Sequence, residues 1–534
     1  MASFDPTPDA ILLWTRLARG VSARWVLARD PELTDVVASG EAVTGPARDG
    51  TIVVDVTGLA PGSTYWYRFT AEGAHSPVGR TRTLPGRGAA ELVIGLVSCA
   101  NFSVAPLTVY RAVAQRDVDL VVHMGDYVYD SKGKKGRRAH RPRGRTVSLA
   151  DYRTRIGQMR SDPDCQAMHL SHPMAMVVDD HDLADNAWRG GAKTHDETTD
   201  GPWADRALAA MTARSEWLPT RRRDPDDVTK TWRSFAVDGL AELVLLDSRL
   251  HGRDKQAGED GALPLTAPER TILGADQREW ALERLADMSC PWTLVANGVV
   301  VNEIVLRPPF ARLFAPLLPE GYAEYDGELL RDDQWDGYPA ERQRLVAAIA
   351  ARNARGGGTV LLSGDVHSSW AFDGPLGEDG GPVAVEVVTP SVSSAPMGRT
   401  RLPVVWRVLD RAVRRLDHVR FVDVTNRGFV LLHVTPARVT AGWHWVDPYD
   451  TDNNPGVEPA QWLAVDRSDD PPSWHDAEPP APPIRTGQRL QLSPRPGDVP
   501  AARRRHQRRR AAGLAAVAAI STAATAAAGR ALRR

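Results

Sequence analysis

Several apolar stretches of the sequence end directly in side chains that can bind metal ions. The four clearest stretches are LVSCAN, VVHMGDYVYD, MVVDDHDLADN and LLSGDVHSSW, and WTLVANG is a weaker fifth. The end of a strand is where an α/β protein usually presents a site, because the strand fixes the residue and the loop after it can vary. The side chains that follow these stretches and have suitable chemistry are Cys99, Asn101, Asp126, Tyr129, Asp130, Asp179, Asp180, His181, Asp182, Asn297, Asp365 and His367.

Each cluster has an ordinary structural interpretation when it is taken alone. Cys99 fits a small buried core residue, Asp126 a helix cap, the pair Asp180 and His181 a surface turn, and His367 a structural histidine. Taken together, the strand ends favour a metal site, because buried carboxylates without compensating charge need cations.

The donor types indicate which metals would bind. A thiolate, a phenolate, a carboxylate and an imidazole suit trivalent iron better than zinc, whereas a neighbouring set of Asp and Asn oxygens suits a harder divalent cation. Asp126 can bridge the two ions. Two metals about 3.5 to 4 Å apart can lower the pKa of a bound water, so that a metal-bound hydroxide is the nucleophile, and can hold phosphoryl oxygens. This set predicts hydrolysis of phosphate esters.

The composition is that of an ordinary soluble globular protein. The chain has 534 residues, of which 42% are hydrophobic and 25% charged, which excludes collagen-like, coiled-coil and wholly disordered chains. A balance of 66 Lys and Arg against 67 Asp and Glu does not fit a general nucleic-acid binder, so we expect no specific nucleic-acid partner. Three widely spaced cysteines argue against a disulfide framework and fit a reducing compartment.

The pattern of the chain predicts two domains and a tail. Residues 1–86 contain short strands at 11–17, 23–29, 51–59 and 64–72, and GLAPGSTYWYRF resembles a fibronectin type III corner, which predicts a small β-sandwich. Residues 90–446 alternate apolar runs with helical periodicity, as in an α/β domain. Residues 447–534 are rich in Pro, Arg and Ala and predict a largely disordered extension. In the α/β part we expect strands at 92–98, 119–125, 174–178, 240–246, 292–298, 359–364, 383–389, 429–435 and 439–445, and helices at 265–287, starting near Ala267, and 340–353.

At this point a family resemblance is clear: the chain resembles the alkaline phosphatase D (PhoD-like) family of metallophosphoesterases. The resemblance covers about residues 4–445 and is carried, in the family's order, by DPTPDAILLWTRL, VSCAN, HMGDYVYD, SLADYRTRI, DDHDLADNAWRGGA, LLDSR, NGVVV and SGDVHSSW. It implies a four-layer αββα sandwich behind a small all-β fibronectin III-like domain, and a site that holds Fe³⁺ with Ca²⁺, other divalent metals remaining an alternative.

The resemblance also implies roles for individual residues. Cys99, Tyr129 and His367 match the residues expected on iron, with Asp126 bridging, and Asp180 and Asp365 face the second metal. Asn297 stands where the family usually has Gln. His181 matches the histidine that assists the leaving group, with a neutral supporting role as the alternative. Arg249, in LLDSR with Asp247, either positions substrate or forms a buried ion pair.

Two features of the termini bear on localisation. The first residues, MASFDPTPDAILLW, contain no cationic leader, so we expect a cytoplasmic protein; export through a misassigned start codon is the alternative. Near the other end, RRRHQRRR at 503–510 precedes an Ala-rich run at 511–529. This run is long enough to span a bilayer but is weakly hydrophobic, so a weak membrane anchor and a disordered basic tail are both open.

A basic loop follows the second motif. Residues 131–147 carry eight Lys or Arg residues. The loop is either a solvated segment without a role or a funnel that attracts anionic phosphoesters to the site.

We therefore predict a monomeric, metal-dependent phosphoric ester hydrolase that acts on anionic mono- or diesters. The enzymatic alternative is a phospholipase D-like or nucleotide phosphodiesterase, of which the nucleotide enzyme is disfavoured because no aromatic stacking residues accompany the basic loop. A binding protein with a degenerate metal site is the alternative of another class. It predicts losses among the metal-binding residues, and none is lost.

Overall fold

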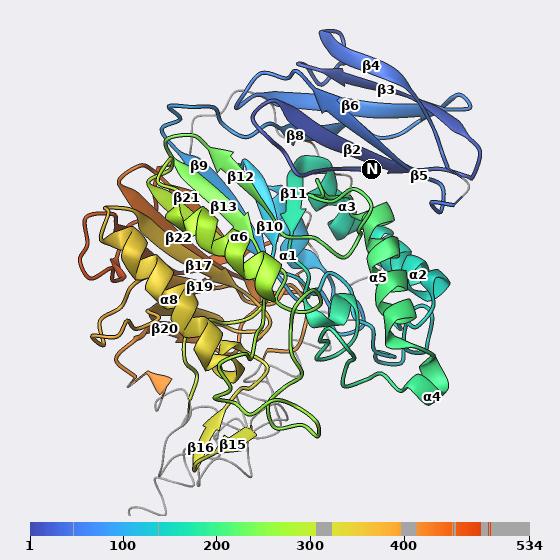
Figure 1. Ribbon diagram of the computed structural model, residues 1–534. Helices are drawn as coiled ribbons and strands as arrows, with labels where there is room; N and C mark the ends of the chain where they lie inside the picture. The colour runs from blue at the N-terminus through green and yellow to red at the C-terminus, as the bar shows by residue number, and fades with distance from the viewer. Residues whose placement is uncertain are drawn as a thin grey trace, which may run out of the picture.

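Figure 1 shows the chain as a computed structural model with two large sheets, helices on their outer faces and a β-rich N-terminal part. The structure describes residues 1–481 except 46, 137, 306–322, 397–412, 415, 451 and 453–454, and it also describes residues 490 and 492. No helix within these residues is long and apolar enough to cross a membrane, and the Ala-rich run at 511–529 lies outside them.

The first large sheet has ten strands in the order β24-β23-β22-β21-β9-β10-β11-β1-β2-β5. Strands β9, β10, β11 and β1 pair in parallel, so the ends of β9 and β10 point to the same edge. In chain order the strands are β1 (Ala2–Phe4), β2 (Ala10–Arg16), β5 (Thr51–Thr57), β9 (Leu92–Val97), β10 (Leu120–His123), β11 (Pro173–Met176), β21 (Gly428–Val434), β22 (Arg438–Val446), β23 (Val457–Asp466) and β24 (His475–Asp476).

The second large sheet has seven strands in the order β12-β13-β14-β17-β19-β18-β20. Strands β13, β14, β17 and β19 run parallel and are buried on both faces, which explains their continuous apolar sequences. The strands are β12 (Arg233–Val237), β13 (Ala241–Leu245), β14 (Trp292–Ala296), β17 (Gly358–Ser363), β18 (Ser369–Asp373), β19 (Val385–Val388) and β20 (Val419–Asp423).

Three apolar clusters hold these layers together. Leu96 and Val122 of the first sheet pack with Leu294 and Leu362 of the second, so the two sheets face each other. The other face of the first sheet packs on α1, α2, α3 and α5, and the other face of the second sheet packs on α6 and α8 (Figure 1). The helices are α1 (Thr108–Ala114), α2 (Leu149–Arg160), α3 (Pro163–Ser171), α4 (Glu197–Asp200), α5 (Trp203–Trp217), α6 (Ala275–Ala286) and α8 (Pro339–Asn353), with short 3₁₀ turns η1 (Asp180–Asp182) and η3 (Trp335–Gly337) and a hairpin of β15 (Ala323–Tyr325) and β16 (Glu328–Leu330).

The N-terminal part is all β but is not structurally separate. Its own sheet contains β3 (Ser22–Ala28), β4 (Val36–Val43), β6 (Thr64–Ala71), β7 (Ala74–His75) and β8 (Gly79–Arg82), and this sheet packs against β2 and β5 through Ile11, Leu13, Tyr65 and Tyr67. Strand β1 pairs in parallel with β11, so β2 and β5 extend the ten-stranded sheet. This continuity ties the first residues to the site-bearing sheet.

All of the expected strands are present, and two element boundaries differ from the expectation. The helix expected at 265–287 begins only at Ala275, because the chain before it is held as a loop by side chains such as Arg270, which bonds three backbone carbonyls. The extension expected to be irregular from residue 447 starts with β23 and β24, which extend the first sheet beyond β22. The remainder of that extension lies outside the described residues, apart from single positions.

Candidate metal centre

Three strands of the two facing sheets bring the candidate metal ligands together. Cys99 follows β9, Asp126 follows β10, and Asp365 and His367 follow β17. All four residues have positive φ angles, between 53° and 59°, although none is glycine. Such backbone is strained by about 1 kcal/mol or more per residue and persists where the surrounding structure holds it, most often at functional sites.

A glycine allows two of the acidic loops to meet. Gly125 has a φ of 93°, and a Cβ atom at this position would lie 2.3 Å from the Cβ of Asp179. Any larger residue would therefore separate Asp126 from the Asp179–Asp180 loop.

The first group of donors contains Cys99, Asp126 and His367. One ligand atom from each lies within 4.8 Å of the others. The phenol oxygen of Tyr129 lies 3.0 Å from His367 Nε2, so Tyr129 belongs to the same cluster. A thiol, a carboxylate, a phenol and an imidazole thus converge from three different loops.

The second group of donors contains only carboxylates. Oxygens of Asp179, Asp180 and Asp365 lie within 4.8 Å of one another, and a further group joins Asp126, Asp180 and His181. Among the described residues, Asp179 Oδ2 and Asp180 Oδ1 have no hydrogen-bond partner although both are buried. Buried carboxylate oxygens without partners are costly, so this group fits a cation.

Arg249 is the positive charge inside this acidic group. Its side chain is fully buried, and its guanidinium lies 2.5 Å from Asp179, 2.7 Å from Asp333, 3.3 Å from Asp365 and 3.7 Å from Asp180. The surrounding carboxylates raise the pKa of Arg249 against the effect of burial, so it stays charged. This geometry fits the buried ion pair, because the side chain is fully buried among carboxylates; a role in positioning substrate stays a prediction. The carboxylate of Asp247 accepts a hydrogen bond from the backbone N–H of Arg249 at 2.9 Å and so stabilises the turn that contains Arg249.

His181 sits beside the first group and is oriented by Asp130. Its Nδ1 lies 2.8 Å from Asp130 Oδ1, and its ring lies against Tyr129 with centroids 4.3 Å apart. Arg206 and Thr194 hold the other oxygen of Asp130. The side chain of His181 keeps 20% exposure, so its ring remains accessible from solvent.

Burial and mutual repulsion dominate the electrostatics of the site. Burial, reinforced by neighbouring carboxylates, raises the pKa values of Asp179 and Cys99, and it raises that of Asp126 although His181 opposes this. Burial lowers the pKa of His367 to about 3, so this imidazole is neutral and able to donate a lone pair. The positive charge of bound cations would compensate the repulsion among the carboxylates.

Comparison with known proteins shows which family the chain belongs to. Residues 1–85 match the family model described as PhoD-like phosphatase, N-terminal domain, and residues 93–443 match PhoD-like phosphatase. The chain belongs to the PhoD-like phosphatase family. It is 29% identical over 484 residues to alkaline phosphatase D of Bacillus subtilis (strain 168), covering 85% of this chain and 78% of that protein. The solved structure described as "Structure of PhoD" superposes with a TM-score of 0.75 at 27% identity, over 90% of this chain and 92% of that one.

Membership of this family establishes the chemistry in outline. The chain is a phosphoric ester hydrolase, as the sequence predicted.

One predicted ligand of this phosphatase has its polar atoms engaged elsewhere. The amide oxygen of Asn297 accepts a hydrogen bond from Trp335 Nε1 at 3.1 Å, and its nitrogen faces the carbonyl of Leu362 at 3.5 Å. One lone pair of the Asn297 oxygen is therefore taken by the indole of η3, and the role of Asn297 as a ligand stays a prediction.

Other residues contribute although the sequence assigned them no individual role. Asp179 joins the carboxylate group directly, and Asp182 accepts backbone N–H groups from both acidic loops, including those of Asp126 and Asp179. Gln334 Nε2 donates to Asp365 at 2.7 Å, and Asp333 binds Arg249. The DDHD motif pointed to Asp179 and Asp182, whereas Asp333 and Gln334 follow no apolar strand and carried no comparable signal.

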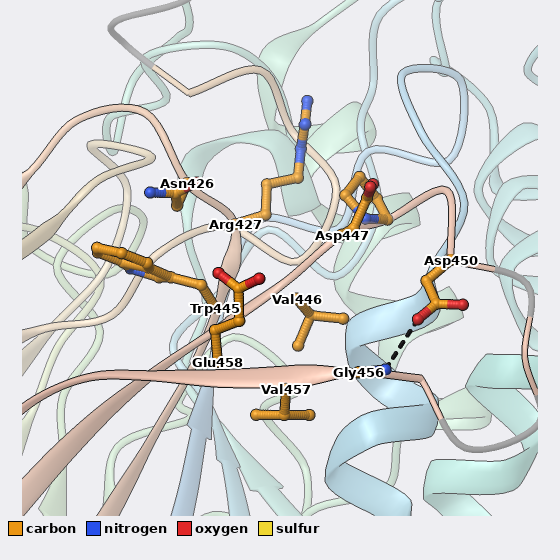
Figure 2. A pocket seen from close by; sticks show the side chains of 10 residues that line it. Asn426, Arg427, Trp445, Val446, Asp447, Asp450, Gly456, Val457 and Glu458 are labelled. Atoms are coloured by element: carbon orange, nitrogen blue, oxygen red, sulfur yellow. Dashed lines mark hydrogen bonds between the residues drawn. The ribbon is translucent and has the colours of Figure 1, made fainter. Parts of the chain in front are cut away.

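A separate pocket of about 270 Å³ lies where β21 begins and β22 ends (Figure 2). Asp450 and Gly456 close one side through a 2.8 Å hydrogen bond, and Arg427 lines the other. None of the donors described above lines this pocket.

Proposed function

We propose that this phosphatase hydrolyses phosphate mono- or diesters with two metal ions held at adjacent donor groups. Cys99, Asp126, Tyr129 and His367 would hold one ion, and Asp126 would share the second with the carboxylate group. The observation that carries this proposal is the convergence of these donors together with buried carboxylate oxygens that accept no hydrogen bond. The second ion would be held by Asp126, Asp179, Asp180 and Asp365.

The donor chemistry supports Fe³⁺ at the first group and Ca²⁺ at the second. A thiolate and a phenolate favour a trivalent or soft ion, and an all-oxygen group favours a hard divalent one. When bound, the two ions would supply Lewis acidity toward water and toward the phosphoryl oxygens.

Protein residues would protonate the leaving group and balance the negative charge of the carboxylates. Asp130 holds Nδ1 of His181, which leaves Nε2 to deliver a proton to the departing alkoxide. Arg249 would keep the carboxylates of the second group in place through its four ion pairs. Burial of the donors excludes bulk water and strengthens each of these interactions.

The basic loop supports an anionic substrate. Arg138 and Arg145 anchor the loop, through Asp162 and Asp200, while Lys132, Lys134 and Lys135 are exposed. Exposed positive charge next to the Asp130 loop would raise the local concentration of phosphoesters. Association with a membrane through the tail is the corresponding proposal for phospholipid diesters.

The layered core and the N-terminal strands also support classing the fold as an αββα sandwich with a fibronectin III-like domain in front. The three apolar clusters between the layers favour this class.

The test combines elemental analysis of the natively purified protein with steady-state hydrolysis of an aryl monoester, an aryl diester and a phospholipid diester. Iron and calcium near one atom each per chain, with metal-dependent turnover, would support the proposal. A metal-free protein that cannot be reconstituted with metal, or turnover that does not depend on metal, would overturn it.

A further inference from the structure

A short serine-rich segment, Thr389–Ser394, crosses from the second sheet to the first beside the donor cluster. It leaves β19 with the Thr389 N–H bonded to the Ser363 carbonyl at 3.0 Å, and it reaches the first sheet where the Val392 N–H donates to Ser98 at 2.8 Å. The segment therefore spans the two sheets at the edge where the candidate ligands lie.

The same segment contacts two of those ligands. The backbone N–H groups of Ser393 and Ser394 both donate to the Cys99 carbonyl, at 3.3 Å and 3.2 Å. The Ser394 hydroxyl donates to the phenol oxygen of Tyr129 at 2.7 Å, and His367 Nε2 lies 3.0 Å from the same oxygen. Ser394 and Tyr129 are 1% and 4% exposed, so water does not compete for this hydrogen bond.

Ser394 is itself held rigidly. Arg427 Nε donates to the carbonyls of Ser393 and Ser394 at 3.1 Å and 2.8 Å, and the Ser391 hydroxyl donates to the Ser394 carbonyl at 3.0 Å. Arg427 also lines the separate pocket (Figure 2), so one side chain contacts both that pocket and this segment. These bonds fix the backbone of Ser394, so its side chain stays directed at Tyr129 when the charge of Tyr129 changes.

We propose that Ser394 is a positioning residue for the metal centre, and that its hydroxyl holds the Tyr129 oxygen in the direction needed to bind the metal. The inference rests on the proposed function, since it takes Tyr129 as a ligand. A serine hydroxyl can donate to a phenol or to a phenolate, so the contact persists when Tyr129 binds a cation. Partners that orient a ligand commonly change metal affinity by about 10- to 100-fold when they are removed.

Ser393 provides a matched control. It is the neighbouring residue, and its hydroxyl donates to the Asn101 carbonyl at 2.9 Å instead of to Tyr129. Ser393→Ala and Ser394→Ala each remove one hydroxyl from the same segment, but only the second removes a contact with a ligand.

The experiment measures how fast the metal-loaded full-length chain loses metal to EDTA, by elemental analysis, together with its visible spectrum. We expect S394A to lose metal about tenfold faster than the wild type, whereas S393A stays close to wild type. Ser394→Thr keeps a hydroxyl and should retain metal like the wild type. Ser394→Val has the shape of threonine without the hydroxyl and should lose metal as fast as S394A. In a Tyr129→Phe background, S394A should have no further effect.

The outcomes separate this inference from the proposed function. If Y129F loses metal quickly but S394A and Ser394→Val retain it like the wild type, Ser394 has no positioning role and the ligand assignment stands. If Y129F itself retains metal at the wild-type rate, Tyr129 is not a ligand and both proposals fail. Equal losses in S393A and S394A would reduce the effect to loosening of the segment and would also overturn the inference.

Discussion

Two buried clusters each contain a Cys, a Tyr and a His but are built differently. The donor cluster consists of Cys99, Asp126, Tyr129 and His367, and the core cluster consists of Tyr127, Cys165 and His169. In the core cluster the Tyr127 hydroxyl lies 3.1 Å from Cys165 Sγ and 2.9 Å from His169 Nε2.

The difference lies in charge and in backbone strain. The core cluster has no carboxylate among its members, whereas the donor cluster contains Asp126 and adjoins Asp179, Asp180 and Asp365. Cys99, Asp126 and His367 have positive φ angles, while none of the three core residues is among the described residues with that conformation. A buried Cys, Tyr and His can therefore form an ordinary core, and the surplus of carboxylates on strained loops is what indicates a metal centre.

The largest effect should follow removal of the shared carboxylate. Asp126→Asn keeps the shape but removes the charge, and we expect kcat/KM for an aryl phosphate to fall about 1000-fold, since Lewis-acid stabilisation amounts to several kcal/mol. Asp336→Asn is the control, because Asp336 is also buried but pairs with Arg342 at 2.6 Å outside both donor groups. Equal activity losses in the two variants would contradict the assignment of Asp126.

The two buried cysteines allow the clusters to be compared directly. Cys99→Ala should lower metal content and reduce kcat by about 100-fold or more, beyond the range for residues that only orient ligands. Cys165→Ala should cost about 1 to 2 kcal/mol of stability and leave the activity of the folded enzyme unchanged. Metal analysis, urea unfolding and steady-state kinetics on both variants check this; a retained metal complement in Cys99→Ala would remove the distinction between the clusters.

A third prediction concerns pH and the surroundings of the core cluster. Burial, with Arg214, lowers the pKa of His123 to about 3, and its Nε2 lies 2.7 Å from the Tyr110 hydroxyl. In the unfolded chain this group titrates near 6.5, so between these values the unfolded state binds one more proton. Its contribution to stability is present above about pH 6.5 and is lost as the pH falls toward 3, by up to about 1.4 kcal/mol per pH unit.

Urea unfolding at pH 7, 6 and 5 measures this slope. His123→Gln should reduce it by the equivalent of one proton, and an identical slope in both proteins would show that His123 is already protonated in the folded state.

The smallest effect should come from the basic loop. Lys132, Lys134 and Lys135 replaced together by Glu should raise KM about fivefold at low salt with little change in kcat, and the effect should fade at high salt as screening increases. Arg24→Glu serves as the control, because Arg24 is 80% exposed in the N-terminal sheet. An unchanged KM in the triple variant would leave the loop without a role in substrate capture.

The sequence predicted strands better than it predicted the ends of helices and domains. Runs such as those around Leu294 and Leu361 are buried on both faces, so their apolar character is continuous and easily recognised. The start of α6 was misplaced because Pro268 resembles a helix start, whereas the tertiary bonds of Arg270 hold that stretch as a loop. The strand β23 was missed because it is only half-buried, so its composition is mixed.

Within the site, the sequence predicted the donor residues but not their hydrogen-bond partners. The donor types of Cys99, Asp126 and His367 could be selected because each follows an apolar strand. The partners of Asn297 could not be foreseen, because the indole of Trp335 comes from a different element.

The sequence by itself determined which chemical groups are available, where the strands end, and that the family's phosphoester chemistry is to be expected, since these depend on residue type and local periodicity. Only the tertiary structure decided which of these groups meet. Cys99, Tyr129, His367 and Ser394 are far apart in the chain and converge because two sheets pack face to face and their loops share one edge. The separation of a metal centre from an ordinary core of the same residue types is therefore a property of packing and of where buried charge accumulates.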